Sequence, residues 1–339
     1  MKALFIQSPG QTAVREIAEP AATPGHALLR IRMVGMCGSD LNTFRGKNPL
    51  VSFPRIPGHE ISATIEALGE GAPESLTPGT NVTLLPYTNC GVCPSCKRGR
   101  PNACRNNQTL GVQRDGALTE LLSVPYGKLR VARTLSLREL AIVEPLTVGF
   151  HAAARGRIAA GDIVTVLGCG AVGLGAIAGS AHRGAVTIAV DIDDAKLALA
   201  RKAGALHTIN TSVTPLHEAL QPLTGGDGPD VVIEAIGTPK TFRAAVEEVA
   251  FTGRVVYIGY AKEEVSYETK YFVQKELDIL GSRNATADDF TSVIEMLEKR
   301  QFPVEETISR VVPLEDVGGA LEAWEASPSS FSKILVEVG

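Results

Sequence analysis

The sequence predicts an α/β protein that combines a β-rich, barrel-like domain with a doubly wound parallel sheet. Residues 1 to about 150 are rich in Gly and Pro and contain short β-like runs at 27–33 and 60–68. From about 161 to 281, apolar strands alternate with helical segments, as they do in parallel sheets. The 339 residues, 44% of them hydrophobic, are enough for about two domains with sizeable cores.

The strands of the second domain are expected at residues 163–167, 186–191, 207–210, 231–235, 255–259 and 279–281. Helices are expected between them at 172–183, 195–203, 215–220 and 240–250. Residues 163–181 carry no charge and are about long enough to cross a bilayer, but their glycines favour a buried strand, turn and helix. The tail offers a helix at 290–300 and a strand at 333–338, and we expect it to return to the first domain.

Charge and leader sequence limit the classes of partner. The net charge is −4 and the isoelectric point is about 5.9, which leaves too little positive field for a nucleic-acid surface. The first residues contain no apolar signal segment. We therefore expect a cytoplasmic protein in a reducing compartment, with no membrane partner and a small molecule as its ligand.

A lobe at residues 90–104 contains the Cys-x2-Cys-x2-Cys-x7-Cys run formed by Cys90, Cys93, Cys96 and Cys104. Four thiolates complete the tetrahedral shell of Zn²⁺ and leave no position for substrate, so the run predicts a structural zinc site. Disulfides are the alternative, but they are rare in a reducing compartment. A zinc knuckle that binds nucleic acid is disfavoured by the low positive charge of the chain.

A glycine motif opens the first helix of the second domain. Gly168, Gly170 and Gly173, with Val172 between the last two, form a G-x-G-x-x-G pattern directly after a predicted strand. This pattern places a dinucleotide pyrophosphate at the helix N-terminus. Asp191 ends the next strand, where its carboxylate can accept from ribose hydroxyls, which predicts NAD rather than NADP; alternatively, Asp191 only caps the following helix. Lys196 weakens the preference for NAD, because its ammonium could bind the 2′-phosphate of NADP.

A second group of possible metal ligands lies in the first domain. Cys37, His59 and Glu60, with Glu144, offer one thiolate, one imidazole and one or two carboxylates. Such a set suits an open zinc site, in which one position is left for water or a substrate oxygen. Taken singly, each of these residues is more often an ordinary buried or polar side chain.

These motifs, in this order along nearly the whole chain, resemble those of the zinc-dependent medium-chain dehydrogenase/reductase family. The resemblance implies a GroES-like catalytic domain at 1–150 and 285–339 and a Rossmann nucleotide-binding domain at 151–284. It also implies two zinc ions per subunit, one catalytic and one structural, and hydride transfer between an alcohol and NAD. We expect a homo-oligomer, either a dimer or a tetramer.

Within the family, Glu144 stands where ethanol-type enzymes have a second cysteine ligand. The chain therefore resembles the polyol and sugar dehydrogenases, and most of all the sugar-acid oxidoreductases of the L-galactonate dehydrogenase kind. Softer signals for that branch are the segments 52–55, 110–112 with 115–116, and 281–286. The expected reaction is oxidation of a secondary hydroxyl on a polyol or sugar acid. Whether Glu60 or Glu144 binds zinc directly stays open.

The resemblance also implies roles for further residues. Ser39 would take the proton of the substrate hydroxyl, and Thr147 would pack near the nicotinamide. Arg283 follows the last strand of the sheet, where its guanidinium could grip a substrate hydroxyl or carboxylate; alternatively, it serves the cofactor or the inter-domain structure. Asn42 replaces a relay histidine of many relatives, and an amide cannot take up a proton. Alternatives are an L-threonine or simple alcohol dehydrogenase, or a catalytically idle, zinc-binding regulatory relative.

Overall fold

The computed structural model describes residues 1–339 and divides into two compact units. The first comprises Met1–Glu144 and Val304–Gly339, and the second comprises Pro145–Pro303. The sequence placed the divisions after residues 150 and 284 instead. The second unit also includes helix α10 (Ala287–Glu298), because Asp289 on this helix bonds His151 on α4 (Val143–Arg155), with 2.8 Å between Oδ2 and Nδ1.

The first unit is built on a mixed, mostly antiparallel sheet with the strand order β14-β15-β3-β4-β5-β7, and β6 also pairs with β3. Side chains of β3 alternate between buried and half-buried along most of its length, so one face supplies the core. The tail returns to this unit, as predicted, because β15 pairs antiparallel with β3. The strands are β3 (His26–Met36), β4 (Glu60–Leu68), β5 (Asn81–Leu84), β6 (Leu121–Pro125), β7 (Leu129–Val131), β14 (Ile308–Pro313) and β15 (Lys333–Glu337).

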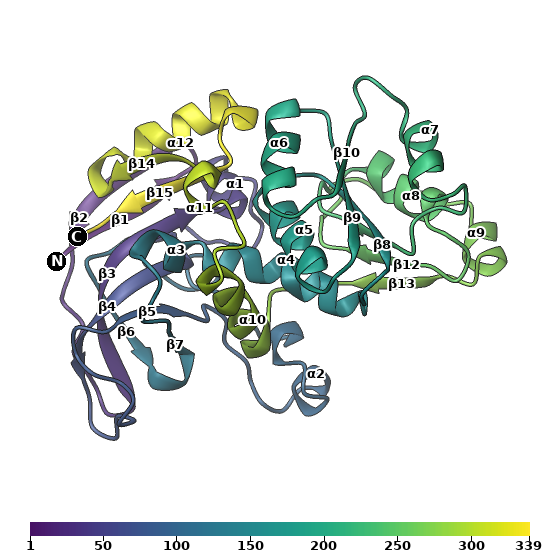
Figure 1. Ribbon diagram of the computed structural model, residues 1–339. Coiled ribbons are helices and arrows are strands. Elements are labelled where there is room, and N and C mark those ends of the chain that lie inside the picture. The colour runs from purple at the N-terminus through teal and green to yellow at the C-terminus, as the bar shows by residue number, and fades with distance from the viewer. The chain divides into compact units, whose positions relative to one another are not determined.

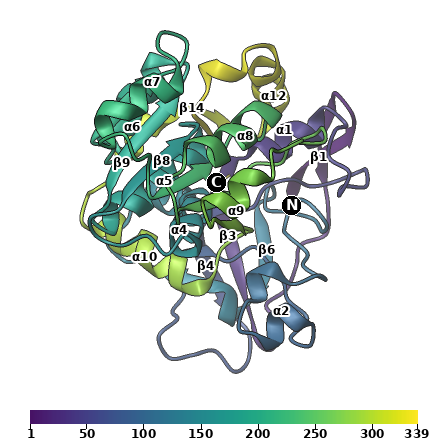
Figure 2. The same ribbon diagram turned by 90° about the vertical axis from the view of Figure 1, so that its right-hand side faces the viewer.

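Smaller elements complete this unit. β1 (Lys2–Ser8) and β2 (Gln11–Glu16) form a separate hairpin, and in Figures 1 and 2 the short helix α2 lies at the lower margin, apart from that hairpin. Helix α3 begins at Ser136 because Ser136 and Glu139 cap each other's backbone N–H groups. The helices are α1 (Gly38–Phe44), α2 (Pro94–Lys97), α3 (Leu137–Ala141), α11 (Val304–Thr307) and α12 (Val317–Ala326).

The second unit contains the predicted parallel sheet, with the strand order β10-β9-β8-β11-β12-β13 (teal to green in Figure 1). The order reverses between β8 and β11, and ligands of such sheets bind outside the carboxyl ends of the strands at that point. The elements are β8 (Ile163–Leu167), α5 (Ala171–His182), β9 (Val186–Asp191), α6 (Asp194–Lys202), β10 (His207–Asn210), α7 (Leu216–Leu220), β11 (Val231–Glu234), α8 (Pro239–Glu248), β12 (Arg254–Tyr257), α9 (Lys270–Gln274) and β13 (Asp278–Gly281).

The uncharged stretch 163–181 folds as strand β8, a turn and most of helix α5. Its strand residues lie in the middle of the parallel sheet, where apolar side chains are needed on both faces. No helix in the structure combines the length and the apolar character that a membrane span requires.

Helices α4 and α5 approach each other closely through glycines. A Cβ atom on Gly149 of α4 would lie 2.0 Å from the backbone nitrogen of Ala176 on α5. Across the same contact, a Cβ on Gly175 would lie 2.7 Å from the carbonyl oxygen of Leu146. Both clashes involve backbone, which cannot give way as a side chain can, so these glycines allow the close packing of the two helices.

We predict that Gly149→Ala lowers the free energy of unfolding by about 1–3 kcal/mol, since the added methyl group must force the helices apart. Gly319→Ala on α12 is the matched control, because nothing lies within 4 Å of its Cβ position. Helix propensity alone should make the control neutral or more stable by about 1 kcal/mol. Urea unfolding of both variants measures the difference, and an unchanged Gly149→Ala protein would contradict the packing argument.

Candidate metal centres and nucleotide site

Two neighbouring strands of the first unit bring Cys37, His59 and Glu60 together. Cys37 follows β3, while His59 and Glu60 stand at the start of β4, and the antiparallel register pairs Gly35 with Glu60. One ligand atom from each of the three residues lies within 4.8 Å of the others. Gly35 leaves room for this group, because a Cβ there would lie 2.0 Å from Glu60 Oε2. The predicted thiolate, imidazole and carboxylate thus form one cluster.

Asp40 fixes the two segments that carry these residues. Its Oδ2 accepts a hydrogen bond from the Cys37 backbone N–H at 2.9 Å, and its Oδ1 accepts from the Gly58 N–H at 3.4 Å. Burial raises the pKa of Asp40, and the nearby imidazole of His59 offsets only part of this rise. The side chain therefore ties the turn before α1 to the residue that precedes His59.

Glu60 forms a buried ion pair with Lys333 at the start of β15. The Lys333 Nζ lies 2.7 Å from Oε1 and 2.6 Å from Oε2, and it also donates to the carbonyl oxygen of Met36 at 3.2 Å. The side chains are only 3% and 1% exposed. Burial lowers the pKa of Lys333, but Glu60 and Cys37 raise it above its usual value, so the ammonium stays charged.

Glu144 belongs to the same site and is held from another side. Its Oε1 accepts a hydrogen bond from the hydroxyl of Tyr87, and both side chains are buried. Burial raises the pKa of Glu144. Burial and the neighbouring Glu144 carboxylate together raise the pKa of Tyr87 well above its usual value. Glu144 lies outside the three-residue group whose ligand atoms meet within 4.8 Å.

The charges of this site favour a cation at its centre. Burial alone would lower the pKa of His59, but Cys37 and Asp40 raise it well above its usual value. His59 Nδ1 is also buried without a hydrogen-bond partner. A site with this excess of negative charge and a thiolate, an imidazole and a carboxylate within reach of one ion fits Zn²⁺.

Ser39 has an unsatisfied side chain at this site. Its hydroxyl Oγ is buried and has no partner, whereas its carbonyl oxygen accepts from Thr43 Oγ1 at 2.9 Å and Asn48 Nδ2 at 3.4 Å. A buried hydroxyl normally finds a partner. The Ser39 hydroxyl is therefore available to form a hydrogen bond with a bound ligand.

The four cysteines of the lobe at 90–104 face one another. The Sγ separations are 3.5 Å for Cys93 and Cys96, 3.8 Å for Cys93 and Cys104, and 3.6 Å for Cys104 and Cys90. A tetrahedral Zn²⁺ with bonds of about 2.3 Å requires sulfur atoms about 3.8 Å apart, whereas a disulfide requires about 2.0 Å. All six cysteines are free thiols. Hydrogen bonds from Ser95 and backbone amides lower the pKa of Cys93 to about 5, which favours its thiolate.

The glycine motif lies between β8 and α5 in the second unit. Gly168 has a φ of +98°, and a Cβ on Gly173 would lie 1.9 Å from the Gly168 carbonyl oxygen. In contrast, nothing lies within 4 Å of the Cβ position of Gly170, so one side of the loop is open. Val172 stands in the first turn of α5, whose N-cap is Gly170.

Asp191 ends β9 next to this loop. Its Oδ2 accepts from the Cys169 N–H at 2.8 Å, and its Oδ1 accepts from the Ile192 N–H at 2.8 Å. The alternative that Asp191 caps the next helix is wrong, because Asp193 is the N-cap of α6 and accepts from the Ala195 N–H at 2.8 Å. Lys196 lies half-buried within α6.

Two further predicted residues also lie in the second unit. Thr147 is fully buried on α4, and Arg283 is exposed, two residues beyond the end of β13. Ser282, beside Arg283, has a buried hydroxyl without a partner.

Comparison with known proteins agrees with these observations. Residues 23–132 match the alcohol dehydrogenase GroES-like domain, and residues 171–299 match the zinc-binding dehydrogenase family. The chain belongs to the zinc-binding dehydrogenase family. L-Galactonate-5-dehydrogenase of Escherichia coli K12 is 31% identical over 92% of both chains, and sorbitol dehydrogenase of Bacillus subtilis is 31% identical over 99% of this chain and 97% of the relative.

A solved structure extends the likeness to the fold. The E. coli CFT073 alcohol dehydrogenase rspB, in complex with NADH, superposes with a TM-score of 0.91 at 30% identity and covers 99% of both chains. The GroES-like β domain and the Rossmann-type sheet are therefore confirmed, as is the medium-chain family. The protein is a zinc-dependent NAD(P) alcohol or polyol dehydrogenase.

Sequence reasoning gave no role to Asp40, Tyr87 or Lys333 of this dehydrogenase. Lys333 alone left a local signal, since it precedes the apolar run Ile334–Val336 of an otherwise buried strand. A lysine at such a position needs a buried counter-charge. Neither Tyr87 nor Asp40 has a local pattern that points to its partner.

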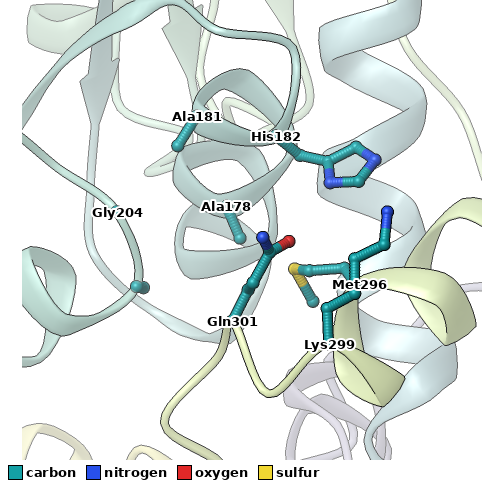
Figure 3. A pocket seen from close by; sticks show the side chains of 8 residues that line it. Ala178, Ala181, His182, Gly204, Met296, Lys299 and Gln301 are labelled. Carbon is teal, nitrogen blue, oxygen red and sulfur yellow. The ribbon is translucent and has the colours of Figure 1, made fainter.

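The second unit also contains a pocket of about 380 Å³. His182, Lys299 and Gln301 line it, together with Met296 (Figure 3). The pocket lies at the C-terminal end of α5, whereas the glycine loop lies at the N-terminal end of that helix. None of the site residues predicted from the sequence lines this pocket, which is separate from the glycine loop.

We predict about two zinc equivalents per chain in protein purified without chelator, one for each ligand group. Cys93→Ser should lower the zinc content to about one equivalent and reduce thermal stability, since structural zinc contributes directly to folding. Cys169→Ser is the control, because Cys169 lies in the glycine loop and should leave the zinc content unchanged. A wild-type value near zero or one would contradict the assignment of two sites.

We also predict that Lys333→Met destabilises the protein by about 3–5 kcal/mol, because it leaves Glu60 buried without its counter-charge. Lys2→Met is the matched control, since Lys2 pairs with Glu315 on the surface, where the two side chains are 49% and 54% exposed. Because solvent screens that surface pair, its loss should change the free energy of unfolding far less than loss of the buried pair does. Urea unfolding with excess zinc measures both, and equal effects would show that burial of the Lys333 pair is unimportant.

Proposed function

We propose that this dehydrogenase oxidises a secondary hydroxyl of a polyol or sugar acid, with NAD as the hydride acceptor. The observation that carries the proposal is the carboxylate-rich character of the catalytic site, where Glu60 and Glu144 accompany one thiolate and one imidazole. A ligand sphere rich in carboxylate is harder and more hydrated than one with two thiolates. It suits a substrate with several hydroxyl groups.

Cys37, His59 and Glu60 would hold the catalytic ion, with Glu144 next to them. When bound, Zn²⁺ acts as a Lewis acid that lowers the pKa of a substrate hydroxyl. Ser39 Oγ, which has no partner within the chain, would accept the proton of that hydroxyl. Because the amide of Asn42 cannot take up a proton, the proton would leave Ser39 for water.

The second unit would bind NAD. The open side of Gly170 leaves room for a pyrophosphate at the N-terminus of α5. Asp191 is fixed by backbone N–H groups, so its carboxylate would accept the adenosine ribose hydroxyls without reorganising. Lys196 would lie near the same ribose, and Thr147 would pack near the nicotinamide.

The relatives support a polyhydroxylated substrate, because their names include an L-galactonate dehydrogenase and a sorbitol dehydrogenase. Arg283 would bind a hydroxyl or an acid group of the substrate through its guanidinium. We further propose a homo-oligomer, either a dimer or a tetramer. Strand β13, at the edge of its sheet, supports this, since Ile279 on it is 42% exposed.

We predict that NAD is preferred over NADP by at least about tenfold in kcat/KM, because a 2′-phosphate would meet the Asp191 carboxylate. Asp191→Ala should narrow that preference. Asp194→Ala, which removes a nearby carboxylate bonded to Asn210, should keep it. Equal kcat/KM for the two cofactors in the wild type would refute the proposed role of Asp191.

We predict that ethanol and other simple alcohols are poor substrates, since a site that hydrogen-bonds several hydroxyls rejects analogues that lack them. Arg283→Ala should raise the KM for the best polyol or aldonate about 10- to 100-fold, while the zinc content stays constant. A screen of polyols, aldonates and short alcohols followed at the nicotinamide absorbance tests the proposal. The proposal fails if kcat/KM for a simple primary alcohol equals or exceeds that for every polyol and aldonate tested. It also fails if Arg283→Ala weakens NAD binding and leaves the substrate KM unchanged.

A further inference from the structure

The first unit contains two half-buried cations that have no counter-charge. The guanidinium of Arg114 donates no hydrogen bond and forms no ion pair within the chain. Lys128 donates from Nζ to the carbonyl oxygen of Tyr87 at 2.5 Å and has no carboxylate partner. Arg114 and a third cation, Arg130, both lie close enough to Lys128 to add to the positive charge around it.

This arrangement is electrostatically unfavourable as it stands. Burial lowers the pKa of Arg114, and no carboxylate counteracts the effect. Burial also lowers the pKa of Lys128, and Arg114 and Arg130 lower it further. The adjacent acid, Asp115, is already bound to Arg55 Nη1 at 3.0 Å and to the Ile56 N–H at 3.2 Å. Partly buried charges of one sign need an anion to compensate them.

The loop that carries Arg114 is packed against a metal-ligand segment. A Cβ on Gly111 would lie 2.5 Å from the Gly58 nitrogen, and one on Gly116 would lie 2.4 Å from the Gly58 carbonyl oxygen. Gly58 directly precedes His59. Arg114 therefore stands on a segment whose two ends are fixed against the residue next to a predicted zinc ligand.

Lys128 is attached to the same site through Tyr87. The carbonyl oxygen of Tyr87 accepts from Lys128, while the hydroxyl of Tyr87 donates to Glu144. The loop and the tyrosine also meet, because Thr109 pairs with Tyr87 and the Leu110 N–H donates to the Pro86 carbonyl oxygen at 3.1 Å. One tyrosine residue thus separates the lysine ammonium from the carboxylate of the catalytic site.

We propose that Arg114 and Lys128 form an anion subsite that binds the acid group of the substrate, a carboxylate or a phosphate, while a hydroxyl further along the same molecule is oxidised. This rests on the proposed function and narrows its substrate class to acidic polyols. The planar guanidinium of Arg114 matches a carboxylate or phosphate bidentately, and the Lys128 ammonium adds a point charge. A neutral polyol would leave both cations uncompensated.

Steady-state kinetics on the zinc-loaded enzyme tests the subsite with a hexonate, a hexitol phosphate and the corresponding neutral hexitol. Arg114→Gln should raise KM for the acidic substrates about 10- to 100-fold and change KM for the hexitol less than about twofold. Lys128→Met should likewise raise KM for the acidic substrates, whereas Lys128→Arg, which keeps the positive charge, should leave that KM close to the wild-type value. Arg133→Gln, an exposed cation of the same unit, is the control and should change neither. Equal effects on acidic and neutral substrates would overturn the proposal.

Titration of the zinc-loaded protein with inorganic phosphate, followed calorimetrically, provides a test that needs no turnover. The wild type should bind phosphate at least about tenfold more tightly than Arg114→Gln. Absence of binding in the wild type would overturn the subsite. Binding that Arg114→Gln abolishes, without any change in KM for acidic substrates, would show a site for free phosphate and overturn the assignment to substrate. If no polyol is oxidised at all, the proposed function fails, whereas the phosphate titration still decides whether the anion subsite exists.

Discussion

The buried ion pair between Glu60 and Lys333 is the interaction on which the catalytic metal site depends. It joins the start of β4 to the start of β15, and the same ammonium binds the carbonyl oxygen of Met36 at the end of β3. Cys37 follows Met36 and His59 precedes Glu60, so one ammonium group sets the spacing of two segments that supply metal ligands. The pair also compensates one carboxylate of a site that otherwise has an excess of negative charge.

Two further polar contacts at the catalytic site accompany that pair. Asp40 links the Cys37 and Gly58 backbones, and Tyr87 holds Glu144. Each contact fixes a charged or ligating group with a neutral donor, so the ligand geometry is built before an ion arrives. A site whose ligands are held in this way by further hydrogen bonds loses little free energy to reorganisation when it binds metal.

The sequence predicted the parts of this structure that depend on local pattern. The inner strands β8, β9, β11 and β12 consist mainly of buried apolar residues, because both faces of a parallel sheet are covered, and all six strands of the sheet were predicted to within about two residues. The lobe cysteines were found by spacing. In contrast, β14 was missed, because its side chains are mostly half-buried or exposed and show no alternation. Lys333 and Glu60 are separated by 273 residues, and no local pattern encodes a partner at that distance.

Pairing of β15 with β3 has a consequence for how the protein folds during synthesis. Residues 145–303, the whole second unit, are translated after β3 and β4 and before Lys333. Throughout that time the nascent sheet lacks both β14 and β15, and Glu60 lacks its ammonium partner. A contact of such long range forms late and slowly. The ion pair that holds the catalytic ligand cluster thus forms only after the second unit has been synthesised. Until then the part of β3 that pairs with β15, Met33–Met36, is open to chaperones and to other unfinished chains.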